Sequence, residues 1–275
     1  MEELVKLIGK KIKIMKKKFT SFLFITAIFF ILLTGIFFIV TINYLFDDYG
    51  LFNSKKEKRI YMDEKDSKYL LSLKYVPSNF DAILVGPSYS DHIETKNITA
   101  YDIYNLSIAG GNISELNYLI KNVYLKRDLK FVIFCLDPFL TKDYDLKSLQ
   151  IIDNPRLTTL FSIKIIKINL KKIYFYLFPD KDKYLGSEWG SNRIIVSKNH
   201  DTLNAINKRV IKIRNDNYHI IVNKKAIIEL GEVVKNLKQK NTKILYYFHP
   251  VPYEIYSQKS YYNEYTDFKN KVILE

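Results

Sequence analysis

An uninterrupted apolar run near the N-terminus constrains this chain more than any other feature of its sequence. From Phe19 to Phe46 the sequence FTSFLFITAIFFILLTGIFFIVTINYLF carries no charged residue. A bilayer core needs about 20 apolar residues in a helix, so this run is long enough to span, with some excess for tilt. Signal peptides have shorter apolar regions, of about 7 to 15 residues, and a cleavage site of small residues. We therefore expect an uncleaved transmembrane helix over residues 19–46.

The charges that flank this run predict its orientation. The segment KKIKIMKKK, residues 10–18, lies directly before it, and Asp47 and Asp48 follow it. Because Lys and Arg concentrate on the cytoplasmic side of membrane helices, we expect residues 1–18 to form a basic cytoplasmic tail. The protein is then a single-pass protein of the cell inner (cytoplasmic) membrane, with an extracytoplasmic main domain. A second basic patch, residues 55–59, weakens the contrast but lies further away.

The net charge of +14 does not indicate a nucleic-acid partner once it is located along the sequence. Residues 1–18 hold seven Lys and two Glu, and the other basic residues are scattered. Lys far outnumbers Arg, which is the better reader of bases and phosphates. We therefore expect no nucleic-acid partner, and attraction to the cytoplasmic membrane or an anionic envelope polymer. The single cysteine, Cys135, is expected to be a small core residue.

Beyond the apolar run, strand-like and helix-like segments alternate. Continuous apolar runs indicate parallel strands covered on both faces, at residues 81–86, 103–109, 130–137 and 242–250. Amphipathic helices are predicted between them, at 113–128 and 224–241, the first with Ser114 close to its N-cap. This alternation predicts an α/β fold with a mainly parallel sheet, a flavodoxin-like three-layer α/β/α sandwich preceded by the N-terminal transmembrane helix.

Two further segments complete the predicted organisation. Residues 47–78 are charged and lack a clear period, so we expect a stalk that ends in a short helix at 63–75. The α/β domain is expected to occupy 79–275, with 139–223 as an insertion over the sheet. The apolar helix predicted at 162–178 within this insertion has three possible roles: part of the core, a lid, or a surface resting on the membrane.

The ends of the predicted strands carry the residues that bear on chemistry. Ligands of open parallel sheets bind beyond the carboxyl ends of the strands. Ser88 follows the first strand, Gly110 the second and His249 the last. A hydroxyl beside convergent backbone amides is the layout of an acyl-transfer site, with a nucleophile and an oxyanion hole. Ser88 in Gly-Pro-Ser is equally compatible with an ordinary turn serine, and Ser90 is a competing hydroxyl one step further from the strand.

Two motifs at these strand ends resemble the SGNH/GDSL hydrolase superfamily. That family places its nucleophile in a Gly-Asp-Ser turn after the first strand, which matches Gly86-Pro87-Ser88. Its second block, Asn-x-x-x-x-Gly, matches residues 105–110, NLSIAG. The resemblance implies that Ser88 is the nucleophile and that Gly110 donates its backbone amide to the oxyanion.

The resemblance covers about residues 79–140 and, more loosely, 224–250. A basic anchor followed by such a domain is similar to cell-envelope members of the superfamily. These include the lipoteichoic-acid D-alanine transfer protein and polysaccharide O-acetyltransferases. The resemblance therefore implies an outward-facing, membrane-anchored protein of the cell envelope.

Two family blocks do not match. The third block ends its strand in Gly-x-Asn-Asp, whose Asn assists the oxyanion, whereas this strand ends Leu136-Asp137-Pro138-Phe139. The last block, Asp-x-x-His, supplies the general base and should follow the last strand, but no histidine follows Pro250. We expect either that the chain stops before its catalytic base or that the family's chemistry is incomplete here.

His249 is the best-placed histidine for a general base, although a substrate contact or a strand cap is also open to it. One Asp-x-x-His sequence occurs at residues 216–219, but it precedes the helix predicted at 224 instead of following the last strand. His92 falls on the helix or loop that leaves the Ser88 turn, and His200 lies in a polar loop without a visible partner. The catalytic candidates are therefore Ser88, Gly110 and His249.

These residues predict a membrane-anchored esterase or O-acyltransferase that acts on a cell-envelope polysaccharide or glycolipid through a serine nucleophile. The alternative is a catalytically inactive SGNH-like protein that binds or assembles components of envelope polymer synthesis. Partners are then the cytoplasmic membrane and either an envelope polysaccharide or a membrane-bound acyltransferase. We expect no cofactor and no metal, because the sequence has no phosphate-binding loop, dinucleotide fingerprint or metal-ligand spacing.

Overall fold

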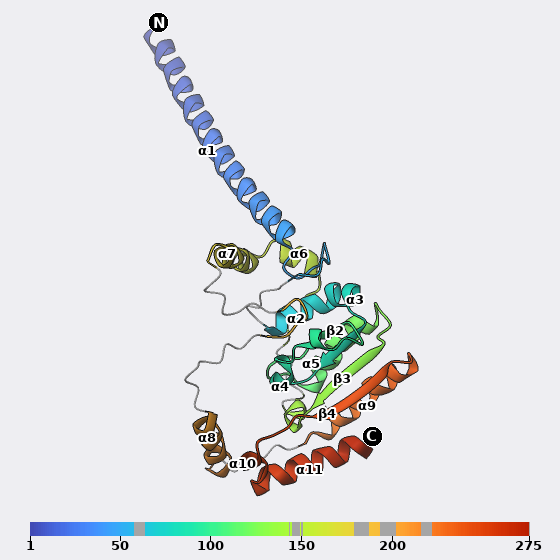
Figure 1. Cartoon of the computed structure of the whole chain (residues 1–275). Coiled ribbons are helices and arrows are strands. Elements are labelled where there is room, and N and C mark those ends of the chain that lie inside the picture. The colour runs from blue at the N-terminus through green and yellow to red at the C-terminus, as the bar shows by residue number, and fades with distance from the viewer. Residues whose placement is uncertain are drawn as a thin grey trace.

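The computed structural model describes residues 1–57, 64–142, 144, 149, 151–178, 187–192, 202–215 and 222–274. A single long helix, α1 (Glu2–Phe46), projects from an α/β body (Figure 1). Its 38 residues from Gly9 to Phe46 are long and apolar enough to cross a membrane, and none of the most apolar stretch is buried by the protein. The basic residues expected as a separate tail are the first part of this same helix.

Four parallel strands form the sheet, in the order β2-β1-β3-β4. They coincide with the four apolar runs of the sequence: β1 (Ala82–Val85), β2 (Ile103–Asn105), β3 (Phe131–Leu136) and β4 (Lys243–Phe248). Strands β1 and β3 are almost wholly buried, which explains why their sequences are continuously apolar. Strand β2 is buried as well, although it ends in the polar residue Asn105. The predicted α/β fold with a parallel sheet is therefore confirmed.

One face of the sheet is covered by helices. The main core joins β1 and β3 to α2 (Glu64–Leu73), α5 (Ile113–Tyr124) and α9 (Lys224–Gln239). Helix α5 begins at Ile113, the first residue of the helix predicted at 113–128, and its N-cap is Asn112, two residues before Ser114. The Asn112 side chain accepts a hydrogen bond from the Glu115 amide, and Glu115 accepts one from Asn112, which is a complete capping box. This cap fixes where the chain turns from the β2 tip into α5.

The opposite face of the sheet has a much smaller apolar cluster. Ala82, Leu84, Ile103 and Ile133 pack there against side chains of the segment between β1 and β2, which contains the short helices α4 (Ser88–Asp91) and η1 (Thr95–Asn97). Leu245, on the outer strand β4, is exposed. Within the ranges that the structure describes, no long helix packs on this cluster, so the third layer of the expected sandwich is not established.

The segment expected to be a stalk contributes to the core. Helix α2 and the short helix α3 (Tyr75–Asn79) bury Leu71, Tyr75 and Val76 completely. The helix predicted at 63–75 is therefore confirmed in position, but the interpretation of its surroundings as a solvated stalk was wrong. The polar residues of α2 can be buried because they form hydrogen bonds and ion pairs with other parts of the fold, which are described below with the candidate site.

The remaining helices form two groups away from the sheet faces. Helices α6 (Pro155–Leu160) and α7 (Ile163–Leu177) contact the end of α1. The second group contains α8 (Thr202–Asn215), α10 (Tyr253–Tyr256) and the first half of α11 (Lys259–Leu274), which pack beyond the carboxyl end of β4. A short turn of helix, η2 (Pro138–Thr141), follows β3.

Candidate functional site

The strand register brings the predicted site residues into one row. Each residue of β2 pairs with the β1 residue 21 positions earlier, as in Leu84 with Asn105. The offset from β1 to β3 is 49 (Val85 with Phe134), and from β3 to β4 it is 112 (Leu136 with Phe248). Counted past the strand ends, where Ser88 already starts helix α4, these offsets correspond to four residues at the carboxyl edge of the sheet, in the order Ala109, Ser88, Asp137 and His249.

Hydrogen bonds show that the pairing of β1 and β2 continues beyond the strands. The Leu106 amide donates to the Leu84 carbonyl at 2.7 Å, and the Ile108 amide donates to the Gly86 carbonyl at 3.1 Å. Neighbouring parallel strands lie about 4.8 Å apart. Ser88 and the Ala109-Gly110 turn therefore leave the sheet side by side, as the two sequence motifs require.

The turn that carries Ser88 is held by an asparagine of the neighbouring strand. The side-chain amide of Asn105 donates to the carbonyls of Ser90 (2.7 Å), Ile93 (3.1 Å) and Asp91 (3.2 Å). Asn105 is completely buried. It therefore fixes the backbone that follows Ser88, which is a positioning role that the sequence motif alone did not reveal.

Gly86 is required by the close packing under this turn. A Cβ at Gly86 would lie 2.5 Å from the Cβ of Cys135 and 2.5 Å from the Ser90 hydroxyl oxygen. Only the absence of a side chain lets β1 and β3 approach so closely at the point where the Ser88 turn begins. Burial raises the pKa of the Cys135 thiol to about 11, so this cysteine is an unreactive core residue, as predicted.

We expect Gly86→Ala to lower the free energy of unfolding by about 1 to 3 kcal/mol, the usual cost of overpacking a core. Thermal unfolding of the detergent-solubilised protein measures the change. Gly35→Ala is the matched control, because a Cβ at Gly35 meets nothing within 4 Å. Equal melting temperatures for the two variants would contradict the close approach of β1 and β3.

A buried lysine ties helix α2 to both turns of the site. Lys68 has no exposed surface; its ammonium donates to Asp91 Oδ1 at 2.6 Å and to the carbonyl of Ser107. Glu64, one helical turn earlier, lies 3.6 Å from the same ammonium and accepts a hydrogen bond from the Ala109 amide at 3.1 Å. The Ser88 and Gly110 turns are therefore attached to the same helix through one charged group.

The Ser88 hydroxyl and the Gly110 amide remain available to a ligand. Neither group makes a hydrogen bond with another described residue. Gly110 is exposed and has a φ of 62°, a left-handed conformation that glycine adopts without strain. Ser90, the competing hydroxyl, is completely buried and donates to the Pro87 carbonyl and the Ser107 hydroxyl. Ser88 is therefore the accessible hydroxyl of this turn.

Asp137 occupies the place between Ser88 and His249 in the row. Its side chain is completely buried; Oδ1 accepts a hydrogen bond from the Phe139 amide at 2.8 Å, and Oδ2 has no partner among the described groups. Burial raises the pKa of this carboxyl to about 6, against the weaker opposing effects of the Phe139 amide and the Arg209 charge. The sequence singled out Asp137 only as a departure from the family, because burial is not visible in an Asp-Pro dipeptide.

His249 stacks on Tyr89 instead of bonding to Ser88. The two rings lie 4.6 Å apart and 11° from parallel, and Arg209 of α8 donates to the Tyr89 hydroxyl at 2.6 Å. Burial lowers the pKa of His249, which favours the neutral imidazole. No described hydrogen bond joins His249 to Ser88. The stacking places the His249 ring against Tyr89, the residue that follows Ser88. In the order of the strands, however, β3 lies between β1, which precedes Ser88, and β4, which precedes His249.

The other histidines do not join this row. His92 is exposed, and its Nδ1 lies 3.0 Å from the Asn192 carbonyl oxygen. His200 and the Asp216–His219 motif lie outside the described residues.

The loop 187–192 lies along the outer edge of β2. There the Trp189 carbonyl accepts a hydrogen bond from the backbone amide of Asn105 at 2.8 Å.

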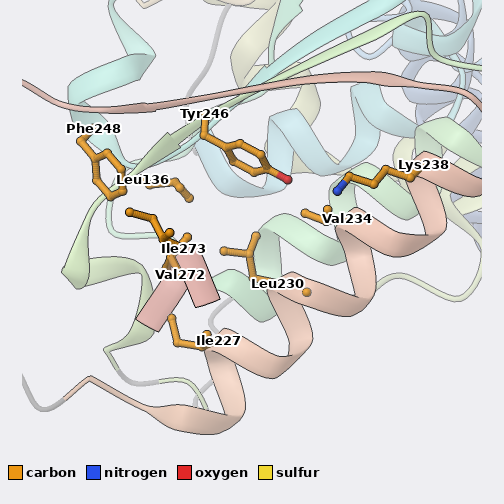
Figure 2. Close-up of a pocket in the computed structure, with 10 residues that line it drawn as sticks. Leu136, Ile227, Leu230, Val234, Lys238, Tyr246, Phe248, Val272 and Ile273 are labelled. Carbon is orange, nitrogen blue, oxygen red and sulfur yellow. The ribbon is translucent and has the colours of Figure 1, made fainter. Parts of the chain in front are cut away.

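An apolar pocket lies away from this row of residues. Its volume is about 370 Å³. Figure 2 shows it between β4, α9 and α11, with the side chains of Leu230, Tyr246 and Phe248 around it. Its lining includes Lys238 but neither a serine nor a histidine. This pocket is therefore not part of the candidate acyl-transfer site.

Comparisons with known proteins identified no related protein. No family model, no curated protein and no solved structure matches the chain. Any functional conclusion therefore depends on the geometry of the site itself.

Proposed function

We propose that this protein is a membrane-anchored, SGNH-like serine esterase or O-acyltransferase acting on a cell-envelope polysaccharide or glycolipid. One observation carries the proposal: the accessible Ser88 hydroxyl and the free Gly110 amide lie on neighbouring turns at the carboxyl edge of a parallel sheet. The charged link through Lys68 supports it further, because a site of this kind needs its groups held in fixed positions.

In the proposed reaction, Ser88 Oγ forms a bond to the carbonyl carbon of an ester while its proton passes to a general base. The negative charge that develops on the carbonyl oxygen is stabilised by backbone amides, including that of Gly110. Collapse of this intermediate expels the alcohol, which takes the proton back and leaves an acyl group on Ser88. Water then releases the acyl group as an acid, or a sugar hydroxyl accepts it as a new ester.

His249 is the base that we assign among the described residues. Its lowered pKa keeps the imidazole able to accept a proton near neutral pH. Its hydrogen bond to Ser88 has to form when substrate binds, by rotation of the ring away from Tyr89. Active sites often tighten such contacts only in the substrate complex.

The location in the cell envelope is part of the same proposal. Helix α1 would span the cytoplasmic membrane with its lysine-rich start inside, following the distribution of Lys and Arg around it. The α/β body would then lie outside, and we propose that it folds as a flavodoxin-like sandwich. A membrane-bound acyltransferase that delivers acyl groups would be a suitable partner for a transfer reaction.

A fluorophosphonate probe tests the role of Ser88, because it labels serines that act as nucleophiles. We expect the full-length protein to be labelled and Ser88→Ala to lose the label. Ser90→Ala is the matched control, since Ser90 is two residues away but buried, and we expect it to keep the label. Equal labelling of the wild-type protein and Ser88→Ala would remove Ser88 from the mechanism.

The second candidate function is a non-catalytic component that binds or assembles envelope polymers. The observation in its favour is that no hydrogen bond joins Ser88 to a histidine among the described residues. A protein of this kind would leave every serine unlabelled by the probe and would still bind polysaccharide. The labelling experiment therefore separates the two functions.

A further inference from the structure

Helices α6 and α7 bury one of their faces against the end of α1. The Asn43 side chain of α1 donates to the carbonyls of Leu160 (2.9 Å), Thr159 (3.1 Å) and Ser162 (3.1 Å), and its own oxygen accepts from Asn169 of α7 at 3.0 Å. Lys172 of α7 forms a buried ion pair with Asp48, just beyond α1. These contacts place α6 and α7 where the apolar helix ends.

The face of α7 that remains exposed is apolar. Ile168 and Asn169 are completely buried, whereas the exposed side carries large apolar residues at intervals of three and four, which is one stripe of a helix. Their exposed fractions run from 40% at Ile173 to 64% at Ile163. The stripe consists of Ile163, Leu170, Ile173, Tyr174 and Leu177. Three flanking residues are similarly exposed: Leu157 of α6, Phe161 directly after α6 and Phe178 directly after α7.

Cations border this apolar stripe. Lys167 and Lys171 are exposed on the neighbouring side of α7. A separate hollow of about 530 Å³ beside the start of α6 has Lys74, Lys126 and Arg156 in its lining. Burial, and then the charge of Arg156, lower the pKa of Lys126. An apolar stripe edged with cations is the pattern of helices that lie in a membrane interface.

We propose that α6 and α7 form a second membrane contact, with the apolar stripe of α7 lying in the interface of the leaflet where α1 ends and its cations facing anionic headgroups. The proposal rests on the transmembrane role of α1 proposed above. Figure 1 shows α6 and α7 at the body end of α1, with α7 lying across that helix. A bilayer crossed by α1 would therefore meet the stripe without any change in the fold. Of the three roles expected for the helix at 162–178, this proposal corresponds to the third, a surface that rests on the membrane.

The position of α7 also argues against the other two roles. The buried face of α7 joins the main core through Ile165 and Ile168, but a role in the core alone would not leave a whole apolar stripe exposed, and a patch of this kind on a soluble surface marks an interaction site. A lid would have to lie over the carboxyl edge of the sheet, whereas α7 is fixed to α1 by Asn43 and Asp48. Lipid is the partner that adjoins this surface once α1 is in a bilayer.

Depth-dependent quenching in nanodiscs of anionic lipid tests the proposal with the full-length chain. Single cysteines that carry an environment-sensitive fluorophore are placed at Leu170 on the stripe, at Leu32 in the middle of α1 and at Leu203 on α8. Leu203 is the matched control, because it is also an exposed leucine on a helix, 70% exposed, but lies near the opposite end of the body. The native Cys135 is buried and does not compete for the label.

We expect lipids that carry a quencher in their acyl chains to quench the labels at Leu32 and Leu170 and to leave the label at Leu203 bright. Quenching at Leu32 without quenching at Leu170 would overturn the second contact and leave the anchor intact. No quenching at either position would show that α1 does not span, so that both proposals about the membrane fail. Shielding at Leu170 that depends on protein concentration and not on lipid would assign the stripe to a second copy of the chain and overturn the proposal.

Discussion

Replacing Lys68 with methionine is expected to lower the free energy of unfolding by about 3 to 5 kcal/mol, the range for removing one partner of a buried ion pair. Methionine has a similar length and no charge, so the loss is electrostatic more than steric. Asp91 would remain buried with a negative charge, 2% exposed, and among the described residues its carboxylate would keep the hydrogen bond from the Asn192 side-chain amide. Thermal or denaturant unfolding of the detergent-solubilised protein measures this loss.

Lys271→Met is the control for the Lys68 experiment. Lys271 pairs with Asp267 at 2.7 Å, but both side chains are close to half exposed, and exposed pairs contribute between about 0 and 1 kcal/mol. Adding Asp91→Asn to Lys68→Met should recover part of the loss, because it removes the unpaired charge. If Lys68→Met lowers the free energy of unfolding no more than Lys271→Met does, Lys68 is not the link that holds the Ser88 and Gly110 turns together.

Replacing Asp137 with asparagine is expected to stabilise the protein at pH 8 and to have little effect near pH 4. The folded state raises the pKa of Asp137 from 3.8 to about 6, so it holds the proton more tightly than the unfolded chain does. The stability from the neutral carboxyl is complete below the unfolded pKa and is lost as the pH rises through about 6. A shift of this size corresponds to about 2 to 3 kcal/mol, and asparagine avoids that loss.

The control for this measurement is Asp267→Asn, which removes an exposed carboxyl. The effect of Asp267→Asn on the free energy of unfolding should not follow the pH dependence expected for Asp137→Asn. Unfolding measured at several pH values between 4 and 8 distinguishes the two variants. A difference between Asp137→Asn and wild type that stays constant over this range would contradict the burial of an ionisable Asp137.

The same substitution bears on the chemistry that we propose. Asp137 lies beside Ser88 in the row of strand ends, where its protonated carboxyl could donate to an oxyanion, as the third-block Asn does in the family that the sequence resembles. Asparagine donates at every pH, so Asp137→Asn should react with the fluorophosphonate probe faster than wild type at pH 8. A folded Asp137→Asn that loses labelling would instead make Asp137 the acceptor of the Ser88 proton.

The strands and five of the helices, α1, α2, α5, α7 and α9, could be predicted from the sequence because their signals are local. The run Phe131–Leu136 is continuously apolar, and it forms a buried strand between two others. The spacing of apolar residues in 224–241 predicted α9, which ends within two residues of the expected position. The helix predicted from residue 113 begins there as α5, but its N-cap is Asn112 and not Ser114; both residue types cap helices well, and only the reciprocal bond with Glu115 decides between them.

The surroundings of α2 could not be predicted in this way. Glu64, Lys68 and Ser72 are polar, so their sequence favours an exposed helix, whereas Lys68 and Ser72 are completely buried. The partners of Lys68 lie 23 and 39 residues further along the chain. No pattern within a helical window reports pairings of that range.

The site itself was predictable in part, for a similar reason. Ser88 and Gly110 follow apolar runs directly, so strand order alone places them at one edge of the sheet. The roles of Asn105, Lys68 and Asp137 depend on burial and on contacts between separate elements. Their residue types carry no such information until the chain is folded.

The junction at Asn43 has a consequence for which molecules can reach Ser88. This one side chain takes part in four hydrogen bonds that join α1 to α6 and α7, which restrict rotation of the body relative to α1. If α1 spans the membrane and Ser88 is the nucleophile, as we propose, the Ser88 hydroxyl would stay at a nearly constant height above the lipid. Polymer segments further from the membrane would then be out of range, and the earliest, lipid-proximal stage of a growing chain would be the one that is modified.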